Sequence, residues 1–196
     1  MEIGLRERKK AATRAALSRA AVRLALERGV EGVTIEAIAE EADVSARTFH
    51  NYFPGKEEAI VAPLFEGARA AIDDLRGRPA DEPIWDSLRH VLLHVLLPSR
   101  SHDERVALLR VVAAEPALVA RQLLEFKEME REIATVIAAR TGTDVERDLY
   151  PHLMAEAAGA AMRAAVEFWM KGGTDADLNA LVHEAFDRLR AGLPGP

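Results

Sequence analysis

The residues between positions 45 and 56 have side chains that can read base edges or bind phosphates. Arginine can bond guanine with two hydrogen bonds, asparagine can do the same with adenine, and an alanine methyl can contact a thymine methyl. Hydroxyl, phenol and ammonium groups are common phosphate ligands. The residues concerned are Ser45, Ala46, Arg47, Thr48, His50, Asn51, Tyr52 and Lys56. A short helix that carries this set has the width to enter the major groove of DNA.

Other chemistry is poorly represented in the sequence. The 196 residues include no cysteine, which excludes disulfides, thiolate nucleophiles and thiolate-ligated metals. His90 and His94 are spaced to share a helix face, so a metal, a hydrogen-bonded structural histidine and a ligand contact all remain open. No nucleophile–base pair, metal ligand set or phosphate loop accompanies them. We therefore expect no metal, no cofactor and no enzyme.

The charge is distributed unevenly. The whole chain carries a formal charge of −6, but residues 1–30 contain eight basic and three acidic residues, or +5. DNA affinity depends on the field over the contact surface rather than on the sum over the chain. A basic N-terminal segment thus permits a nucleic-acid partner. A solvated helix with a basic face explains the same run equally simply.

The apolar residues recur at helical spacings almost throughout, which predicts an all-α fold of about nine helices. Gly29, the pair Pro54-Gly55, and the glycine and prolines of residues 76–83 mark chain breaks. The predicted helices span about 7–28, 34–41, 45–52, 56–76, 84–97, 101–115, 116–140, 143–171 and 174–191. Thr34 and Ser45 are expected to cap the second and third helices, and Thr174 with Asp177 the last one. Capping boxes are expected at Ser101 with Glu104 and at Thr143 with Glu146. Neither a signal peptide nor a membrane span is recognisable, so a cytoplasmic protein is expected.

Residues 33–56 form the most informative segment. Two short amphipathic helices are joined there by a tight turn at Asp43-Val44, which is the helix-turn-helix arrangement. Apolar residues on both helices are expected to fix their mutual angle, with Phe49 and Phe53 in the core. We therefore expect a helix-turn-helix DNA-binding domain of three helices over residues 1–55. Residues 56–196 are then expected to form a helical ligand-binding and dimerisation domain.

Several positions in this segment are similar to the TetR family of transcriptional regulators. The similarity lies in Val33-Thr34-Ile35, Ala42-Asp43-Val44-Ser45, Thr48-Phe49, Tyr52-Phe53 and Lys56-Glu57, together with Ile38-Ala39. It covers about residues 7–60, and the remainder matches in length and helical character only. The resemblance implies a homodimer that binds a palindromic operator. It also implies that a small molecule releases the DNA by entering the C-terminal domain.

The resemblance also implies individual roles. Thr34, Ser45, Thr48, Tyr52 and Lys56 match positions that bind phosphates, and Ala46, Arg47, His50 and Asn51 match positions that face base edges. Lys56 at a helix start opposes the helix dipole and gains nothing locally, which favours a nearby anion. Alternatively, Tyr52 is a surface aromatic that packs on the first helix, and His50 and Asn51 are simply solvated.

The candidate effector-binding residues are more loosely defined. Gln122 interrupts an apolar stripe and needs a partner, and the methionines suit an adaptable cavity. The candidates are Trp85, His94, Gln122, Phe126, Met129, Met154 and Met162. Core packing is the competing interpretation for each of them. Their largely apolar character indicates a hydrophobic or amphipathic ligand.

The last two predicted helices suit an interface between copies of the chain. The helix near 144–171 is rich in alanine and is apolar around most of its circumference, more than one internal partner requires. The family resemblance implies that it pairs with its symmetry mate, together with the helix near 174–191. Pro63 is expected to kink the helix over 56–76, which makes that helix a candidate lever between the two domains.

A ligand-responsive repressor is the function that accounts for most of these features. Two alternatives remain: a helical-bundle enzyme, and a ligand-binding or adaptor module without DNA function. The intact polar set from Ser45 to Lys56 argues against the second alternative, and the absence of a catalytic constellation argues against the first.

Overall fold

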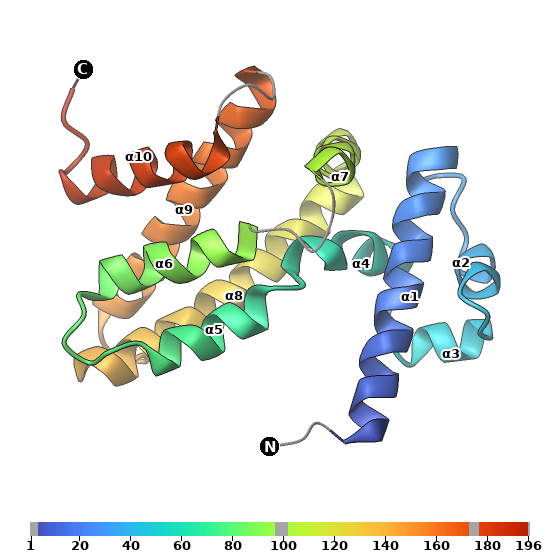
Figure 1. Cartoon of the computed structure of the whole chain (residues 1–196), viewed down its shortest axis with the longest axis horizontal. Coiled ribbons are helices and arrows are strands. Elements are labelled where there is room, and N and C mark those ends of the chain that lie inside the picture. Colours follow the sequence, from blue (N-terminus) through green and yellow to red (C-terminus); the bar gives the residue numbers. More distant parts are fainter. Residues whose placement is uncertain (1–3, 97–101, 173–176, 196) are drawn as a thin grey trace. The chain divides into compact units, whose positions relative to one another are not determined.

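The computed structural model describes residues 4–96, 102–172 and 177–195. Every regular element in those ranges is a helix, which confirms the predicted all-α fold (Figure 1). The elements are α1 (Leu5–Arg28), α2 (Ile35–Glu41), α3 (Ala46–His50), α4 (Lys56–Val61), the 3₁₀ helix η1 (Ala62–Phe65), α5 (Ala68–Gly77), α6 (Ile84–Leu96), α7 (His102–Ala114), α8 (Pro116–Thr141), α9 (Leu149–Gly172) and α10 (Leu178–Arg190). Counting α4, η1 and α5 as one interrupted helix gives the nine that the sequence predicts.

The chain divides into two compact units. The first unit comprises Met1–Glu66 and Arg100–Leu124, and the second comprises Gly67–Ser99 and Glu125–Pro196. The first unit therefore contains α1–α4, α7 and the beginning of α8, while the rest of α8 belongs to the second unit. The proposed functional division at residues 55 and 56 stays a prediction, because compactness alone does not say which residues bind DNA.

Helix α1 is the central element of the first unit. Its buried residues, which include Leu17 and Leu24, pack with α2, α4 and the end of α3 in one apolar core. Ser18 is also buried there, and its hydroxyl donates to the carbonyl of Ala59 on α4 at 2.8 Å. As predicted, α1 ends at Gly29, whose φ of 73° and ψ of 160° are accessible essentially to glycine alone. This glycine lets the chain turn back toward α2.

The predicted helix over 56–76 is broken rather than kinked. Helix α4 ends at Val61, a 3₁₀ turn with Pro63 in its first positions follows, and α5 begins only at Ala68. Proline supplies no N–H for an i to i−4 hydrogen bond and its ring crowds the preceding turn, so a tighter turn replaces the α-helix. The first of the two segments that make up the first unit ends at this break, between Glu66 and Gly67.

The second unit has a core of its own, formed by α5, α6, most of α8, α9 and α10. Arg140 on α8 fastens the connection between α5 and α6, because its guanidinium donates to the carbonyls of Leu75, Pro79 and Glu82 at 3.2, 2.8 and 3.4 Å. These three hydrogen bonds join α8 to the end of α5 and to the loop that follows it. Asp177 caps α10 by accepting from the Asn179 N–H at 3.0 Å, as predicted.

The same connection contains an acid with a low pKa. Hydrogen bonds from Arg78 and then from Ser87 lower the pKa of Glu82 to about 2, from an ordinary value of 4.5. Because the folded-state pKa is the lower one, these contacts stabilise the fold above about pH 4.5. Their contribution is lost as the pH falls toward 2.

The predicted start of the helix after residue 143 is wrong. The chain forms a turn there, in which the Asp144 N–H donates to Asp148 at 2.7 Å and the Glu146 N–H donates to Asp144 at 2.8 Å. Asp144 accepts from the Glu146 N–H that a Thr143 cap would have used, and the Thr143 N–H donates to the Ala138 carbonyl at 3.1 Å, so α9 begins only at Leu149. The other predicted box lies partly outside the described residues, which omit Ser101.

Candidate nucleic-acid interface and ligand cavity

Helices α2 and α3 are each fixed at their beginning by a hydroxyl cap. Thr34 accepts from the Ala37 N–H at 3.2 Å, and Ser45 accepts from the Thr48 N–H at 3.1 Å. The Ser45 and Thr48 hydroxyls also bond each other at 2.9 Å. Caps of this kind satisfy N–H groups that no helical carbonyl can reach. Thr34 and Ser45, which the sequence analysis predicted as phosphate ligands, thus also fix the first residues of α2 and α3.

The turn between α2 and α3 is a Schellman motif. The Asp43 N–H donates to the Glu40 carbonyl at 3.0 Å, and the Val44 N–H donates to the Ala39 carbonyl at 2.9 Å. Asp43 has a φ of 54°, in the left-handed region that aspartate tolerates better than most residues do. This turn sets the angle between α2 and α3, and it lies where the sequence predicts the tight turn of a helix-turn-helix.

Helix α3 packs on aromatic residues beneath it. Phe49 and Phe53 are buried with their ring centroids 5.8 Å apart. The Arg14 guanidinium lies over the Phe53 ring at 4.1 Å and donates to the Tyr52 carbonyl at 2.7 Å. It also pairs with Glu58 of α4 at 3.6 Å. Arg14 on α1 therefore contacts both the end of α3 and the beginning of α4. Phe49 and Phe53 lie in the core, as the sequence predicted.

The predicted base-reading side chains lie on the outer side of this helix. Arg47, His50 and Asn51 are exposed, while Ala46 is half-buried. His50 keeps an edge contact with Phe49, with the ring centroids 5.7 Å apart. A short exposed helix with a rigid base can offer such side chains to the major groove. Thr48 and Tyr52, predicted phosphate ligands, are half-buried at the edges of the same surface.

Lys56 has a local role that the sequence did not reveal. Its ammonium donates to the carbonyls of Val30 and Val33 at 2.9 Å each. The expectation that it gains nothing locally is therefore wrong, because the loop between α1 and α2 folds back to supply two acceptors. An ammonium has three donors, so one remains for a phosphate. A phosphate contact by Lys56 stays a prediction.

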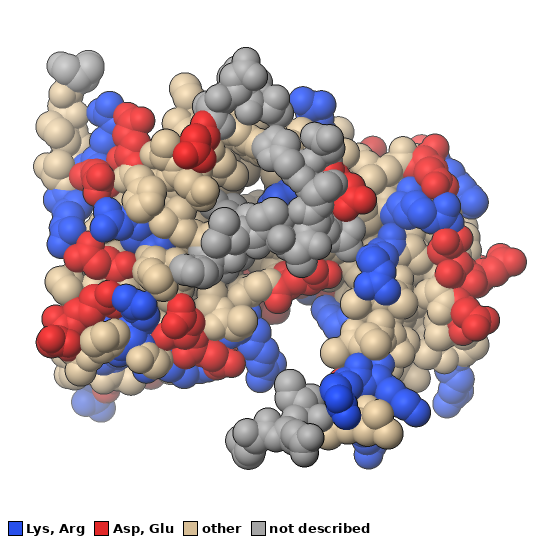
Figure 2. Space-filling model, viewed as in Figure 1, with Lys and Arg blue, Asp and Glu red and all other residues tan. Residues whose placement is uncertain are grey.

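A groove beside α3 combines Asn51 and Tyr52 with residues of α1 that sequence reasoning did not select individually. It has a volume of about 620 Å³ and lies between the beginning of α1 and the end of α3. Its lining residues are Leu5, Arg6, Lys9, Lys10, Thr13, Asn51 and Tyr52. Lys and Arg side chains gather over this end of α1 in Figure 2. The excess of basic residues in the first thirty positions was the available signal, but a solvated helix face explained it as well.

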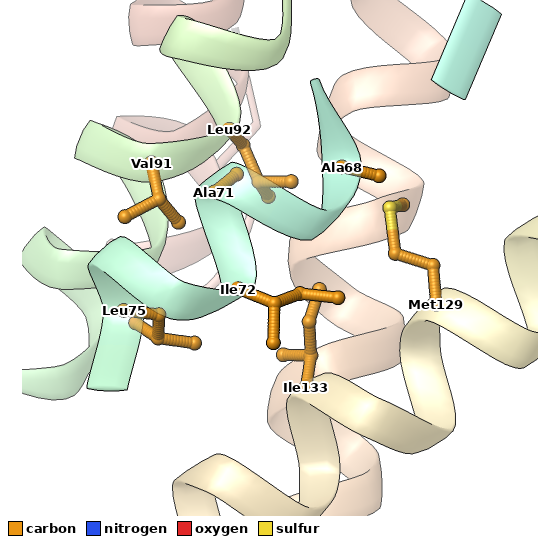
Figure 3. A pocket seen from close by; sticks show the side chains of 8 residues that line it. All are labelled: Ala68, Ala71, Ile72, Leu75, Val91, Leu92, Met129 and Ile133. Atoms are coloured by element: carbon orange, nitrogen blue, oxygen red, sulfur yellow. The ribbon is translucent and has the colours of Figure 1, made fainter. Parts of the chain in front are cut away.

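The second unit contains a narrow apolar cavity among α5, α6 and α8. Its lining residues are Ala68, Ala71, Ile72, Leu75, Val91, Leu92, Met129 and Ile133, and their side chains contain only carbon and the Met129 sulfur (Figure 3). No part of it is wide enough for a water molecule. Among the predicted effector residues whose side chains the structure describes, Met129 is the one that lines it.

The other predicted effector residues are dispersed. Trp85 packs on Phe186 of α10 with ring centroids 4.8 Å apart and donates its indole N–H to the Phe186 carbonyl at 3.2 Å. Met154 and Met162 on α9 belong to the core of the second unit. The Phe126 ring lies 5.4 Å from the guanidinium carbon of Arg163. Trp85 and the two α9 methionines thus contact the core of the second unit, and their role as effector ligands stays a prediction.

The remaining two predicted effector residues are Gln122 and His94. Gln122 is half-buried in the first unit, and the His94 side chain lies outside the described part of the molecule.

His90 approaches Asp74, with Nε2 3.8 Å from the carboxylate oxygen. Across the ranges that the structure describes, no group of three or more histidine, aspartate or glutamate side chains is arranged to hold a metal ion. Nor is any helix in those ranges both long and apolar enough to cross a membrane.

Comparison with known proteins identifies the class. The profile of bacterial regulatory proteins of the tetR family matches residues 17–62, and the profile of the MftR C-terminal domain, a TetR-type domain, matches residues 82–194. The chain is 34% identical over 199 aligned residues to the HTH-type transcriptional regulator TcmR of Streptomyces glaucescens, covering 97% of this chain and 88% of that protein. The chain therefore belongs to the TetR family. It is a DNA-binding transcriptional regulator, and regulators of this family are not enzymes.

Solved structures agree with the fold. SmeT, the repressor of the Stenotrophomonas maltophilia multidrug efflux pump SmeDEF, superposes with a TM-score of 0.60 at 18% identity, over 93% of this chain and 96% of that one. A Clostridium perfringens putative fatty acid metabolism regulator gives a TM-score of 0.59 at 16% identity, over 92% of this chain and all of that one. At such identities the likeness concerns the fold alone.

Proposed function

We propose that this regulator acts as a homodimeric repressor that binds a palindromic operator in the cytoplasm. An apolar small molecule releases the DNA. The observation that carries the proposal is α3, which is capped at Ser45, supported by Phe49 and Phe53, and exposed along the side that bears Arg47 and Asn51. A rigid exposed helix of this composition is suited to the major groove. The alternative of a helical module without DNA function leaves that surface unexplained.

Base reading and phosphate binding are separable on this surface. Arg47→Ala is expected to weaken binding to the operator by about 10- to 100-fold and to leave affinity for unrelated duplexes almost unchanged, because a bidentate base contact carries about 1–3 kcal/mol of discrimination. Tyr52→Phe removes one hydroxyl and is expected to weaken binding to both duplexes alike. Fluorescence anisotropy with operator and scrambled duplexes measures both variants. Equal losses on both duplexes for Arg47→Ala would contradict the assignment.

The proposed dimer uses α9. Its exposed side bears Leu153 and Phe168, at 58% and 63% exposure, with the small residues Ala157, Ala160 and Ala164 between them at helical spacing. An apolar stripe of this length on a single chain is typical of a protein–protein contact. Small residues let the helix of a second copy approach closely. A two-fold dimer then presents two α3 helices to two half-sites about 34–36 Å apart.

Introducing a charge into that stripe is expected to separate the subunits. Phe168→Glu should weaken dimerisation by about tenfold or more, since a carboxylate would be buried without a partner. Operator affinity should fall with it, because two linked half-sites bind far more tightly than one. Leu123→Glu, at an exposed leucine of α8 outside the stripe, is the matched control. Sedimentation equilibrium measures both, and an unchanged dimer of Phe168→Glu would contradict the proposed interface.

The proposed effector site is the apolar cavity of the second unit. Because the described residues that line it are all apolar, the matching ligand is a hydrophobic molecule, and it must separate the walls to enter. A ligand that binds an opened cavity better than a closed one shifts the equilibrium toward the opened form. SmeT has been solved as a complex with triclosan, which makes triclosan a suitable first probe.

Filling the cavity should remove the ligand response without removing DNA binding. Ala68→Phe places a ring at the cavity wall, whereas Ala70→Phe places the same ring on the exposed side of α5. We expect the unaltered chain and Ala70→Phe to show triclosan-induced stabilisation in a thermal shift assay and release from operator. Ala68→Phe should show both effects at least about tenfold more weakly. Equal responses in the two variants would place the effector elsewhere.

A further inference from the structure

The groove between α1 and α3 is chemically distinct from the base-reading side of α3. Arg6, Lys9, Lys10 and Thr13 line one wall from successive turns of α1, and the other wall comes from Asn51 and Tyr52. The spacing of three and four residues places the α1 side chains on one face of that helix. Its volume of about 620 Å³ makes it an open channel rather than a packing defect.

The positive charges in this groove are not neutralised within the described residues. Further along α1, Arg14 pairs with Glu58, and Arg23 pairs with Glu27 and Glu41. By contrast, Arg6, Lys9 and Lys10 have no ion-pair partner in the ranges that the structure describes, and all three are exposed. Clustered cations with no counter-charge repel one another and raise the local concentration of anions. The groove therefore favours a polyanion.

The groove is also continuous with the recognition surface. Asn51 and Tyr52, which follow α3 directly, belong to both. Their position is fixed, because the Tyr52 carbonyl accepts from Arg14 and the Phe53 ring lies beneath the same guanidinium. A DNA strand that leaves the end of α3 thus meets Lys9 and Lys10 next, with no flexible segment between the two surfaces.

We propose that this groove binds the sugar–phosphate backbone of the operator just beyond the bases that α3 reads. Lys9 and Lys10 each neutralise one phosphate, and Arg6 adds to the attractive field. The proposal rests on the proposed function, and it extends the DNA footprint of each subunit outward from its half-site. These contacts carry no sequence information, since phosphates are the same at every base pair.

Salt dependence gives the proposal a quantitative test. Each phosphate contact adds about 0.9 to the slope of log K against log salt concentration. A dimer loses two such contacts when Lys9 is removed, so the slope should become shallower by about 1.8 in Lys9→Ala. Between 50 and 200 mM salt, that difference changes the ratio of affinities by about 12-fold. Lys10→Ala should behave in the same way, and Lys9→Arg should restore the original slope.

The experiment measures the affinity of the full chain for operator and scrambled duplexes from about 50 to 300 mM KCl, a range over which such slopes are resolved. Arg19→Ala is the matched control, because Arg19 is an exposed basic residue of α1 outside the groove. We expect shallower slopes on both duplexes for Lys9→Ala and Lys10→Ala, and an unchanged slope for Arg19→Ala. Hydroxyl-radical footprints should lose protection at the outer edges of each half-site in the two lysine variants.

Two results would overturn the proposal. Unchanged salt slopes and unchanged footprints in both lysine variants would show that DNA does not enter the groove. If Arg47→Ala still weakened binding to the operator alone, the proposed function would remain supported. A slope change of equal size in Arg19→Ala would show a general charge effect instead of a groove contact. Failure of the unaltered chain to bind any duplex would overturn both proposals together.

Discussion

Replacing Arg163 by methionine is expected to lower the free energy of unfolding by about 3 kcal/mol. Arg163 on α9 donates to Oε1 of Glu130 on α8 at 2.7 Å, and Glu130 is only 5% exposed. Lys127 approaches the second carboxylate oxygen at 3.1 Å, outside hydrogen-bonding geometry. Without the guanidinium, a buried carboxylate would keep a single, largely exposed partner. Breaking a buried ion pair costs about 3–5 kcal/mol, and the surviving lysine keeps the loss near the lower limit.

The matched control for Arg163→Met is Arg188→Met. Arg188 pairs with Glu184 one turn away on α10, and both side chains are more than half exposed. Exposed pairs of this kind contribute about 0.5 kcal/mol or less. Urea unfolding followed by circular dichroism measures both variants. A loss below about 1 kcal/mol in Arg163→Met would contradict the view that this pair is a buried contact between α8 and α9.

The double variant Glu130→Leu with Arg163→Met distinguishes the contribution of the ion pair to stability from that of side-chain packing. Replacing both partners of a buried ion pair by apolar side chains of similar size is often neutral. We therefore expect the double variant to recover most of the stability that Arg163→Met loses. Gly159 belongs to the same arrangement, since a Cβ there would lie 2.7 Å from Glu130 Oε1 and 2.9 Å from Arg163 Nη1. A glycine in the alanine-rich α9 thus makes room for the ion pair.

Replacing Phe53 by alanine is expected to cost about 3–5 kcal/mol, the usual range for truncating a buried aromatic ring. Phe53 is fully buried in the core of the first unit, in contact with Phe49 beneath α3 and with the Arg14 guanidinium. Its loss leaves a cavity under the recognition helix and removes the platform for Arg14. Operator binding should be lost together with stability, because α3 is no longer held at a fixed angle.

Phe53→Leu keeps most of the apolar volume and serves as the comparison. It is expected to cost less than about 1.5 kcal/mol and to retain operator binding. Chemical unfolding and anisotropy titrations on the same preparations give both quantities. If Phe53→Ala bound operator with unchanged affinity, α3 would owe its position to other contacts, such as its Ser45 cap and the turn at Asp43.

Much of the first unit was determined locally, which is why the sequence predicted it. The caps at Thr34 and Ser45 and the stop at Gly29 depend on residues within three positions of one another or on a single φ angle. The two phenylalanines follow from helical periodicity. Such features need no knowledge of distant chain segments, so residue types and spacing are sufficient.

Contacts between distant segments were decided only by the tertiary structure. Lys56 lies opposite the carbonyls of Val30 and Val33 because the loop before α2 folds back over it, and no spacing rule encodes that. Glu130 and Arg163 are 33 positions apart, and each alone looks like a solvated charge. The groove of Arg6, Lys9 and Lys10 exists because the end of α3 forms its second wall.

The apolar cavity of the second unit illustrates the same limit. The sequence analysis predicted polar and aromatic residues such as Trp85 and Gln122 as effector ligands. The described residues that line the cavity are instead apolar residues of α5, α6 and α8, of the kind found in any core. The sequence thus determined the helices, the helix-turn-helix and its polar surface, because local hydrogen bonds and periodic burial specify them. Only the tertiary structure decided which helices enclose the cavity and which charges are buried, because both depend on how distant helix faces meet.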